Sequence, residues 1–348
     1  MHFKLILSVM ALLVGSAVAM LPAAAQPAEP TTLFSSDEPI RLSIRSDLSR
    51  LARANGALPA TLTVMGETPE THSIQLSPRG VSRRRREICT FPPLRVELPS
   101  RPTSGLFEGQ RRLKLVTHCR RQSSHQQYVL LEYTAYRLFN TMTSRSFRVR
   151  LAEIDYYRND DAEPSYTRVG FFIEDVDDAA ERNGMVEVER GDFPTSWLNQ
   201  EDAARVALFQ YMVGNLDWAV QAGPPGEDCC HNTRPIGATE NATSNLTSLP
   251  YDFDQTGLVF APYSAPPAQI RVSSVRTRVY RGFCSHNAYT RTIAAEVLAA
   301  RAQYEAVIAS IPNLPERRRS RAQSYLADFF DDIATPADVE DNLIDECS

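Results

Sequence analysis

The residues with the clearest capacity for chemistry are one lysine and a series of acids that follow it. Lysine occurs at positions 4 and 114 alone, in a chain that carries 37 Lys and Arg residues together. A lysine ammonium is a compact point charge that suits contact with phosphate groups, whereas a guanidinium spreads its charge over a plane. The retention of Lys114 among so many arginines therefore indicates a phosphate-contacting residue, and a chance survivor is the alternative.

Glu132 is the first acid that stands apart from ordinary surface charge. Good helix formers from about Ser124 to Thr141 predict a helix, and Glu132 shares one of its faces with Ala135, Tyr136 and Phe139. A carboxylate on an apolar face is costly unless it finds a partner. Because a strand lysine paired with a helix glutamate positions phosphates in kinase-type sites, we predict an ion pair between Lys114 and Glu132. A glutamate at the edge of the apolar stripe, with its carboxylate in water, is the alternative.

Two further acidic features lie in the second half of the chain. Asp217 follows a helix predicted over Asn199–Val213 that stops at Gly214, and loop acids held by rigid scaffolds are common places for catalysis. Asp252 and Asp254 alternate with aromatic residues, so in an extended segment both carboxylates would face the same way. Since Mg²⁺ is a hard ion that shares its oxygen ligands with substrate phosphates, we predict that this pair binds Mg²⁺ or Mn²⁺. A turn or capping role is the alternative for Asp217.

Asn232 completes an ordered set. A kinase-type site uses a base-like aspartate, a following asparagine and a later metal-binding aspartate, in that order. Asp217, Asn232 and the Asp252–Asp254 pair occur in the same order, which predicts that they act in one site. Asn215 is a competing candidate for the asparagine.

Composition and the N-terminal residues limit which classes of protein the chain can belong to. A net charge of −5 and a pI near 5.8 argue against a dedicated nucleic-acid binder, and the basic runs Arg83–Arg86 and Arg317–Arg319 are interpreted as solvated surface. The basic start, the apolar run Leu5–Val18 and the small residues after it predict a signal peptide over residues 1–25, followed by a linker over 26–40. No later stretch is long and apolar enough for a transmembrane helix. We therefore expect a secreted or periplasmic protein with no transmembrane span after signal removal.

Six cysteines fit that oxidising destination: Cys89, Cys119, Cys229, Cys230, Cys284 and Cys347. An even count permits three disulfides without giving their connectivity. Cys89 and Cys119 lie in neighbouring strand-like segments and could pair, which would leave the other four to the second half. A zinc site is the rival interpretation, but adjacent cysteines are poor tetrahedral ligands and no spaced Cys-x-x-Cys occurs.

Strand and helix patterns divide the chain into two parts. Alternating apolar and polar residues predict strands between residues 40 and 96, and again at 112–117, 147–155 and 168–174. Later helices are predicted over Asn199–Val213, Tyr289–Ile311 and Arg321–Ile333. This order predicts a two-lobed α+β architecture, with a strand-rich lobe over residues 41–178 that holds one main helix and a mainly helical lobe over 179–348.

Taken together, the motifs resemble a known family. Over roughly residues 75–260 the chain looks like the spore-coat protein H (CotH) kinase-like proteins, an atypical branch of the protein-kinase-like fold. The resemblance rests on the order and spacing of several short motifs, among them Arg112-Leu-Lys-Leu-Val, Gly214-Asn-Leu-Asp-Trp, His231-Asn232 and Pro250-Tyr-Asp-Phe-Asp. It implies a two-lobed protein-kinase-like fold that binds ATP and phosphorylates protein Ser or Thr.

The resemblance also implies a role for each candidate residue. Lys114 would contact the nucleotide phosphates and Glu132 would hold Lys114 in place. Asp217 would orient the acceptor hydroxyl, as the catalytic residue. The metal would be bound by three side chains, those of Asn232, Asp252 and Asp254.

Three functions from different classes follow. The leading hypothesis is an exported atypical kinase that transfers a phosphoryl group from Mg-ATP to a protein Ser/Thr or another hydroxyl, with a nucleotide and an unknown protein acceptor as partners. The second is a catalytically silent kinase-like module for binding or assembly in the envelope, which the missing Gly-rich phosphate loop and the scarcity of ATP outside the cytoplasm favour. The third is a metal-dependent glycosyltransferase that uses Asp252 and Asp254, although the chain lacks the alternating strand–helix domain usual ahead of such a motif.

Overall fold

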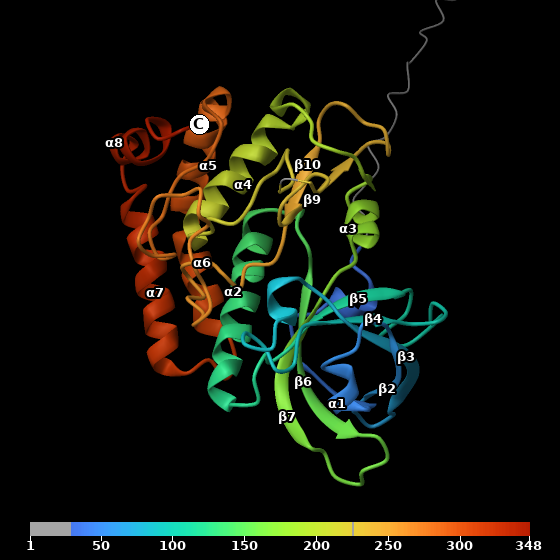
Figure 1. Ribbon diagram of the computed structural model, residues 1–348. Helices are drawn as coiled ribbons and strands as arrows, with labels where there is room; N and C mark the ends of the chain where they lie inside the picture. The colour runs from blue at the N-terminus through green and yellow to red at the C-terminus, as the bar shows by residue number, and fades with distance from the viewer. Residues whose placement is uncertain (1–28, 225) are drawn as a thin grey trace, which may run out of the picture.

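The computed structural model describes residues 29–224 and 226–348, so the expected signal peptide lies outside the described residues. Seven strands form a closed barrel in the order β1-β2-β3-β4-β5-β7-β6 (Figure 1). They are β1 (Ile40–Ser46), β2 (Leu58–Val64), β3 (Glu70–Pro78), β4 (Leu94–Glu97), β5 (Arg112–Val116), β6 (Val149–Arg158) and β7 (Tyr166–Ile173). Neighbouring strands are antiparallel except β1 and β6, which run parallel and close the barrel.

Side-chain alternation explains the inner face of the barrel. In β1 the side chains of Ile40, Leu42 and Ile44 are buried, and those between them are exposed or half-buried. This is the period of two expected when one face of a strand meets a core. Phe107 and Phe172 pack edge to face inside, with ring centroids 5.6 Å apart. Closure leaves the barrel with an apolar interior and with its strand edges paired.

The predicted two-lobed, protein-kinase-like α+β fold is wrong, because the strands close into a mixed barrel. Individual strands lie close to their predicted positions, as β5 at Arg112–Val116 does. Closure depends on the parallel register of β1 with β6, in which Ile40 lies opposite Ala152 and Ser46 opposite Arg158. Alternation in a sequence shows which side chains face inward, but it does not show which distant strand is the partner.

Helix α2 (Gln126–Met142) connects the barrel to the other helices. Its Tyr136 ring packs against Phe171 of β7 with ring centroids 5.6 Å apart. Phe139, one turn further along, packs against Phe209 at 4.5 Å. In Figure 1 this helix stands between the barrel and the C-terminal helices. Side chains therefore project from α2 toward both parts of the molecule, which makes it the natural support for a site between them.

The remaining helices are α1 (Leu48–Leu51), α3 (Val176–Arg182), α4 (Gln200–Val213), α5 (Asn287–Ala299), α6 (Arg301–Ser310), α7 (Glu316–Asp331) and α8 (Pro336–Val339). A small sheet has the order β10-β9-β8, formed by β8 (Val186–Glu187), β9 (Thr233–Gly237) and β10 (Thr247–Pro250). The helix predicted over Tyr289–Ile311 is two helices that meet at Ala300. No Gly or Pro occurs at that break, which is why it is not predicted from local signals.

Gly214 ends α4 in the left-handed conformation, with φ of 63°. A Cβ at this position would lie 2.0 Å from the Tyr325 hydroxyl. The residue must therefore be glycine for conformational and for steric reasons. The predicted end of the helix at Gly214 is confirmed, and Asp217 lies on the loop that follows it.

Three disulfides link all six cysteines: Cys89–Cys119, Cys229–Cys230 and Cys284–Cys347. The pairing of Cys89 with Cys119 is confirmed. Within the expected linker over 26–40, Leu33 and Phe34 are buried in the barrel core. Among the described residues, no helix combines the length and apolar character needed to cross a membrane.

Candidate functional site

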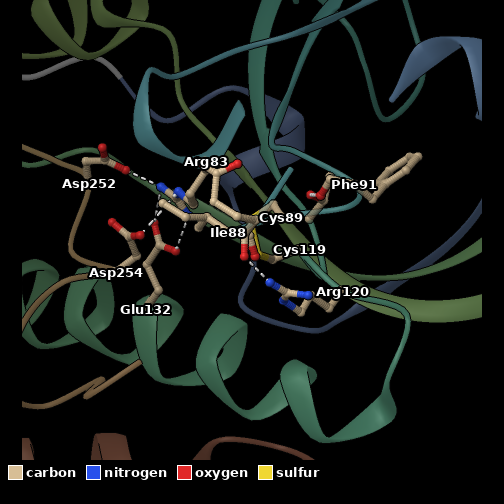
Figure 2. Close-up of a disulfide and its surroundings, with 11 residues drawn as sticks. Arg83, Ile88, Cys89, Phe91, Cys119, Arg120, Glu132, Asp252 and Asp254 are labelled. Carbon is tan, nitrogen blue, oxygen red and sulfur yellow. Dashed lines mark hydrogen bonds and ion pairs between the residues drawn. A yellow bond between two sulfur atoms is a disulfide. The ribbon is translucent and has the colours of Figure 1, made fainter. Parts of the chain in front are cut away.

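The site is organised around one buried arginine. Arg83 is 6 % exposed, and its guanidinium contacts three carboxylates (Figure 2). Its Nη1 donates to Oε2 of Glu132 at 2.9 Å, and its Nε lies 3.3 Å from Oδ2 of Asp254. Its Nη2 donates to Oδ1 of Asp252. One cation therefore faces three acids in a region with little water.

This imbalance shifts the ionisation of every member. Although burial disfavours its charge, the acids around Arg83 hold its pKa well above the usual value. Burial raises the pKa of Asp254 to about 8, against the pull of Arg83, and it raises the pKa of Glu132 as well. The pKa of Asp252 is lowered, because Arg83 and Arg79 outweigh the effect of burial. The cluster thus holds three carboxyl groups beside one cation, and burial keeps Asp254 largely protonated at pH 7.

Three segments supply the side chains of this cluster. Arg83 lies in a 3-10 turn, Ser82–Arg84, on the loop that follows β3, and the same loop is fixed to Cys119 through Cys89. Glu132 is a buried residue of α2. Asp252 and Asp254 follow β10, where Asp252 adopts a φ of 64° and its backbone N–H donates to the Tyr136 hydroxyl at 3.0 Å. A left-handed non-glycine residue is costly, and such residues are concentrated at functional sites.

Lys114 does not pair with Glu132, which contradicts the predicted ion pair. On β5, its Nζ lies 5.1 Å from the Phe147 ring centroid and 5.0 Å from that of Tyr251. Within residues 29–224 and 226–348, no carboxylate lies within salt-bridge distance of this amine. Burial, with the nearby charges of Arg79 and Arg234, lowers the pKa of Lys114 to about 7. The amine thus lies near two other cations without a carboxylate of its own in the part of the chain that the structure describes, whereas Arg234 lies 3.6 Å from Glu187.

Asp217, His231 and Asn232 form a second, connected group. His231 Nε2 lies 2.7 Å from Oδ1 of Asp217, and that hydrogen bond raises the pKa of His231. Asn232 Nδ2 donates to the backbone oxygen of Asp217 at 2.7 Å and to its Oδ2 at 3.3 Å. Asn232 also has a left-handed backbone, with φ of 52°. The carboxylate of Asp217 is thereby held in one orientation while it stays 31 % exposed.

A backbone contact joins the two groups. The N–H of Tyr251 donates to the backbone oxygen of Asn232 at 2.9 Å, which extends the pairing of β9 with β10. Tyr251 also packs against Lys114 and precedes Asp252 in the chain. The structure therefore brings Lys114, Glu132, Asp252 and Asp254 into one neighbourhood, and it places Asp217 and Asn232 beside them. Asn215 accepts from the N–H of Asp217 at 2.9 Å, so it supports the loop.

Arg83 is the residue that the sequence analysis missed. The run Arg83–Arg86 was interpreted as solvated surface, which is wrong for Arg83 and correct for the exposed Arg84, Arg85 and Arg86. A run of identical residues carries no periodic signal that singles out one member. The available signal was indirect: buried acids need a cation, and Lys114 alone is too few for Glu132, Asp252 and Asp254.

Asp252 and Asp254 are the candidate donors for the divalent cation expected from the sequence, and both contact Arg83. Oδ2 of Asp254 is buried and accepts no hydrogen bond from any described residue. Asp252 is partly exposed, at 31 %. No group of three or more His, Cys, Asp or Glu in the described residues has the arrangement of a metal site. Two carboxylates with an amide oxygen suit Mg²⁺, which commonly takes one or two protein carboxylates and completes its sphere with phosphates and water.

Comparisons with known proteins add no assignment. No protein-family model matches the chain, and a comparison with curated proteins gives no match. No family is therefore assigned to the chain from these comparisons.

Replacing Arg83 with Met should destabilise the protein strongly. Loss of one partner from a buried ion pair leaves uncompensated charge and costs about 3–5 kcal/mol, and here three acids would lose their shared cation. Urea unfolding at neutral pH measures the difference. The matched control is Arg84→Met, an exposed neighbour for which we expect a change within about 0.5 kcal/mol. Equal stability of the two variants would show that the cluster contributes nothing to folding.

The ionisation of Lys114 can be measured directly, because a chain that begins at residue 26 contains no other lysine. The ε-carbon resonance of labelled lysine should titrate near pH 7, against 10.5 for an ordinary lysine. Between those two pH values the unfolded chain holds a proton that the folded chain has released. The free energy of unfolding should therefore rise with pH across this window by a contribution that Lys114→Met lacks. A titration close to the ordinary value would contradict the assigned environment.

Proposed function

We propose that the chain transfers a phosphoryl group from ATP, with Mg²⁺ or Mn²⁺, to the hydroxyl of a protein Ser or Thr or of another acceptor. The observation that carries the proposal is that a lysine, Lys114, and an acid, Asp252, lie on either side of Tyr251. On one side the Lys114 amine has no carboxylate within salt-bridge distance among the described residues, although Arg234 near it pairs with Glu187. On the other side three carboxyl groups share the one guanidinium of Arg83. A nucleotide with its divalent cation would supply an anion to the amine and a cation to the carboxyl groups.

Each residue group has a role in this reaction. Lys114 and Arg79 would bind the phosphates, and Asp252, Asp254 and the amide oxygen of Asn232 would hold the cation. The cation, when bound, neutralises the phosphate oxygens. His231 and Asn232 hold the Asp217 carboxylate toward the acceptor. The acceptor oxygen forms a bond to the γ-phosphorus while the bond to the β-phosphate oxygen breaks, the hydroxyl proton passes to Asp217, and ADP leaves.

A second function, a silent binding module, is favoured by a specific observation. The guanidinium of Arg83 contacts both Asp252 and Asp254, so it occupies oxygens that a cation would need. A pocket so neutralised would hold a nucleotide or another anion without turnover. Of the two carboxylate oxygens of Asp252, Arg83 contacts Oδ1. The other oxygen, Oδ2, would remain for a cation in the first function.

The proposal also includes a location outside the cytoplasm and a relation to the CotH kinase-like proteins. Three disulfides suit an oxidising environment, and we place the protein outside the cytoplasm, secreted or periplasmic. The resemblance of the motifs to the CotH kinase-like proteins agrees with phosphoryl transfer, although the barrel differs from the fold that the resemblance implied. The protein acceptor would then be an envelope or extracellular polypeptide.

Labelled ATP tests the reaction. Mature wild-type protein with Mg²⁺ or Mn²⁺ should incorporate phosphate into itself or into added Ser/Thr peptides and release ADP. Asp252→Asn should abolish the transfer, and Asp217→Asn should reduce it by about 10²–10⁴-fold, the range of a general base. Asp228→Asn, at an exposed loop acid, is the control with the same change in charge and should keep full activity.

A thermal-shift titration separates the two functions. Bound nucleotide must raise the apparent stability of the folded chain. Stabilisation by Mg-ATP without transfer would favour the silent module. Folded protein that shows neither transfer nor stabilisation would contradict both functions.

A further inference from the structure

A second charged pocket lies on the opposite side of the Cys89–Cys119 disulfide. Its cavity measures about 480 Å³, within the range of small-ligand sites. Four arginines line it, Arg53, Arg86, Arg120 and Arg121, and no acid does. In Figure 2, Arg83 points from the disulfide loop toward the acids, while Phe91 and Arg120 lie on the other side of the sulfur bridge. The pocket is thus distinct from the site around Asp252.

The four guanidiniums are not neutralised by the protein. None of them pairs with a carboxylate in residues 29–224 or 226–348. Glu87, the one acid between Ser82 and Phe91, lies 3.8 Å from Arg85. Arg53 and Arg120 donate to backbone oxygens, and these bonds use only part of their donor capacity. Such a cluster, in a chain with a net charge of −5, leaves many N–H groups directed at solvent.

The cluster is built on a rigid base. The Cys89–Cys119 disulfide and a hydrogen bond from Phe91 N to Cys119 O at 3.0 Å fix the two loops to each other. Arg168 Nε donates to the backbone oxygen of Arg121 at 3.1 Å. The Arg121 guanidinium lies 5.3 Å from the ring centroid of Tyr166. The arginines therefore project from a preorganised surface, which lowers the entropic cost of binding.

A buried, neutral histidine lies beneath this pocket. His118 is fully buried and stacks on Phe91 with ring centroids 4.8 Å apart. Neither of its ring nitrogens has a hydrogen-bond partner among the described residues. Burial, with the charges of Arg168 and Arg121, lowers the pKa of His118 to about 3. The ring is therefore neutral and adds no charge that would need an anion of its own.

We propose that this pocket binds a multivalent oxyanion, a ligand that carries clustered phosphate or sulfate groups. Arginine forks bind such groups through paired, charge-assisted hydrogen bonds. A single phosphate would leave most of the four guanidiniums unpaired, so the charge count favours several linked groups. Phe91 and Tyr166 supply an apolar wall against which the body of the ligand can pack. The proposal does not depend on phosphoryl transfer at the other site.

Calorimetry with two probes tests the pocket: tripolyphosphate, and a heparin-derived hexasaccharide. EDTA is present throughout so that the metal-dependent site is not engaged. Arg86→Ser combined with Arg121→Ser should weaken binding at least about tenfold, since each lost charged contact is worth roughly that factor. Arg271→Ser combined with Arg317→Ser removes the same charge at exposed positions elsewhere and should change the affinity less than about twofold.

The outcomes separate the sources of the anion. Binding of tripolyphosphate alone identifies a phosphate ligand, and binding of the hexasaccharide alone identifies a sulfated glycan. Absence of binding to both probes, or equal weakening in the two double variants, overturns the proposal. Arg53→Ser combined with Arg86→Ser repeats the test if the first pair unfolds, and far-ultraviolet circular dichroism checks each variant.

Discussion

The ion-pair cluster of Arg83 is the constraint on which the rest of the structure depends. Its guanidinium connects the loop after β3, helix α2 and the segment after β10. These three segments lie far apart in the sequence, and a buried charge tolerates little displacement of its partners. The cluster therefore fixes where α2 stands against the barrel and where the chain leaves β10. The disulfide at Cys89 restrains the same loop a few residues later, so both ends of the Arg83 segment are held.

Acidic and basic side chains occupy separate parts of the site. The three acids gather around Arg83, whereas Lys114, Arg79 and Arg234 gather around the ring of Tyr251. The two groups differ in their partners: Arg234 pairs with Glu187 and Lys114 has no carboxylate in contact among the described residues, while three carboxyl groups share Arg83. The proposed nucleotide with its divalent cation would place phosphates near Lys114 and a positive ion near the acids. The depressed pKa of Lys114 and the raised pKa of Asp254 both come first from burial, and like charges nearby add to each shift.

Local features could be predicted from the sequence, because they depend on neighbours in the chain. The helix around Glu132, its burial on an apolar face and the loop position of Asp217 after Gly214 follow from periodicity and capping. The convergence of Asp252 and Asp254 was expected from alternation in an extended segment, yet the left-handed backbone at Asp252 breaks that alternation. Both acids meet because Arg83 attracts them. Barrel closure and the burial of Arg83 depend on distant partners, which no local pattern encodes.

In the run Arg83–Arg86, identical residues differ in burial because their surroundings differ. Arginine keeps its charge in any surroundings, so each member must find anions or remain in water. The 3-10 turn at Ser82–Arg84 directs Arg83 toward three acids and leaves the later members on the surface. Arg86 then lines a pocket that holds no acid. One short loop, held by the Cys89–Cys119 disulfide, therefore carries both a buried arginine paired with acids, Arg83, and a surface arginine without an acid among its described neighbours, Arg86. The surface arginine is available to bind an anion from solution.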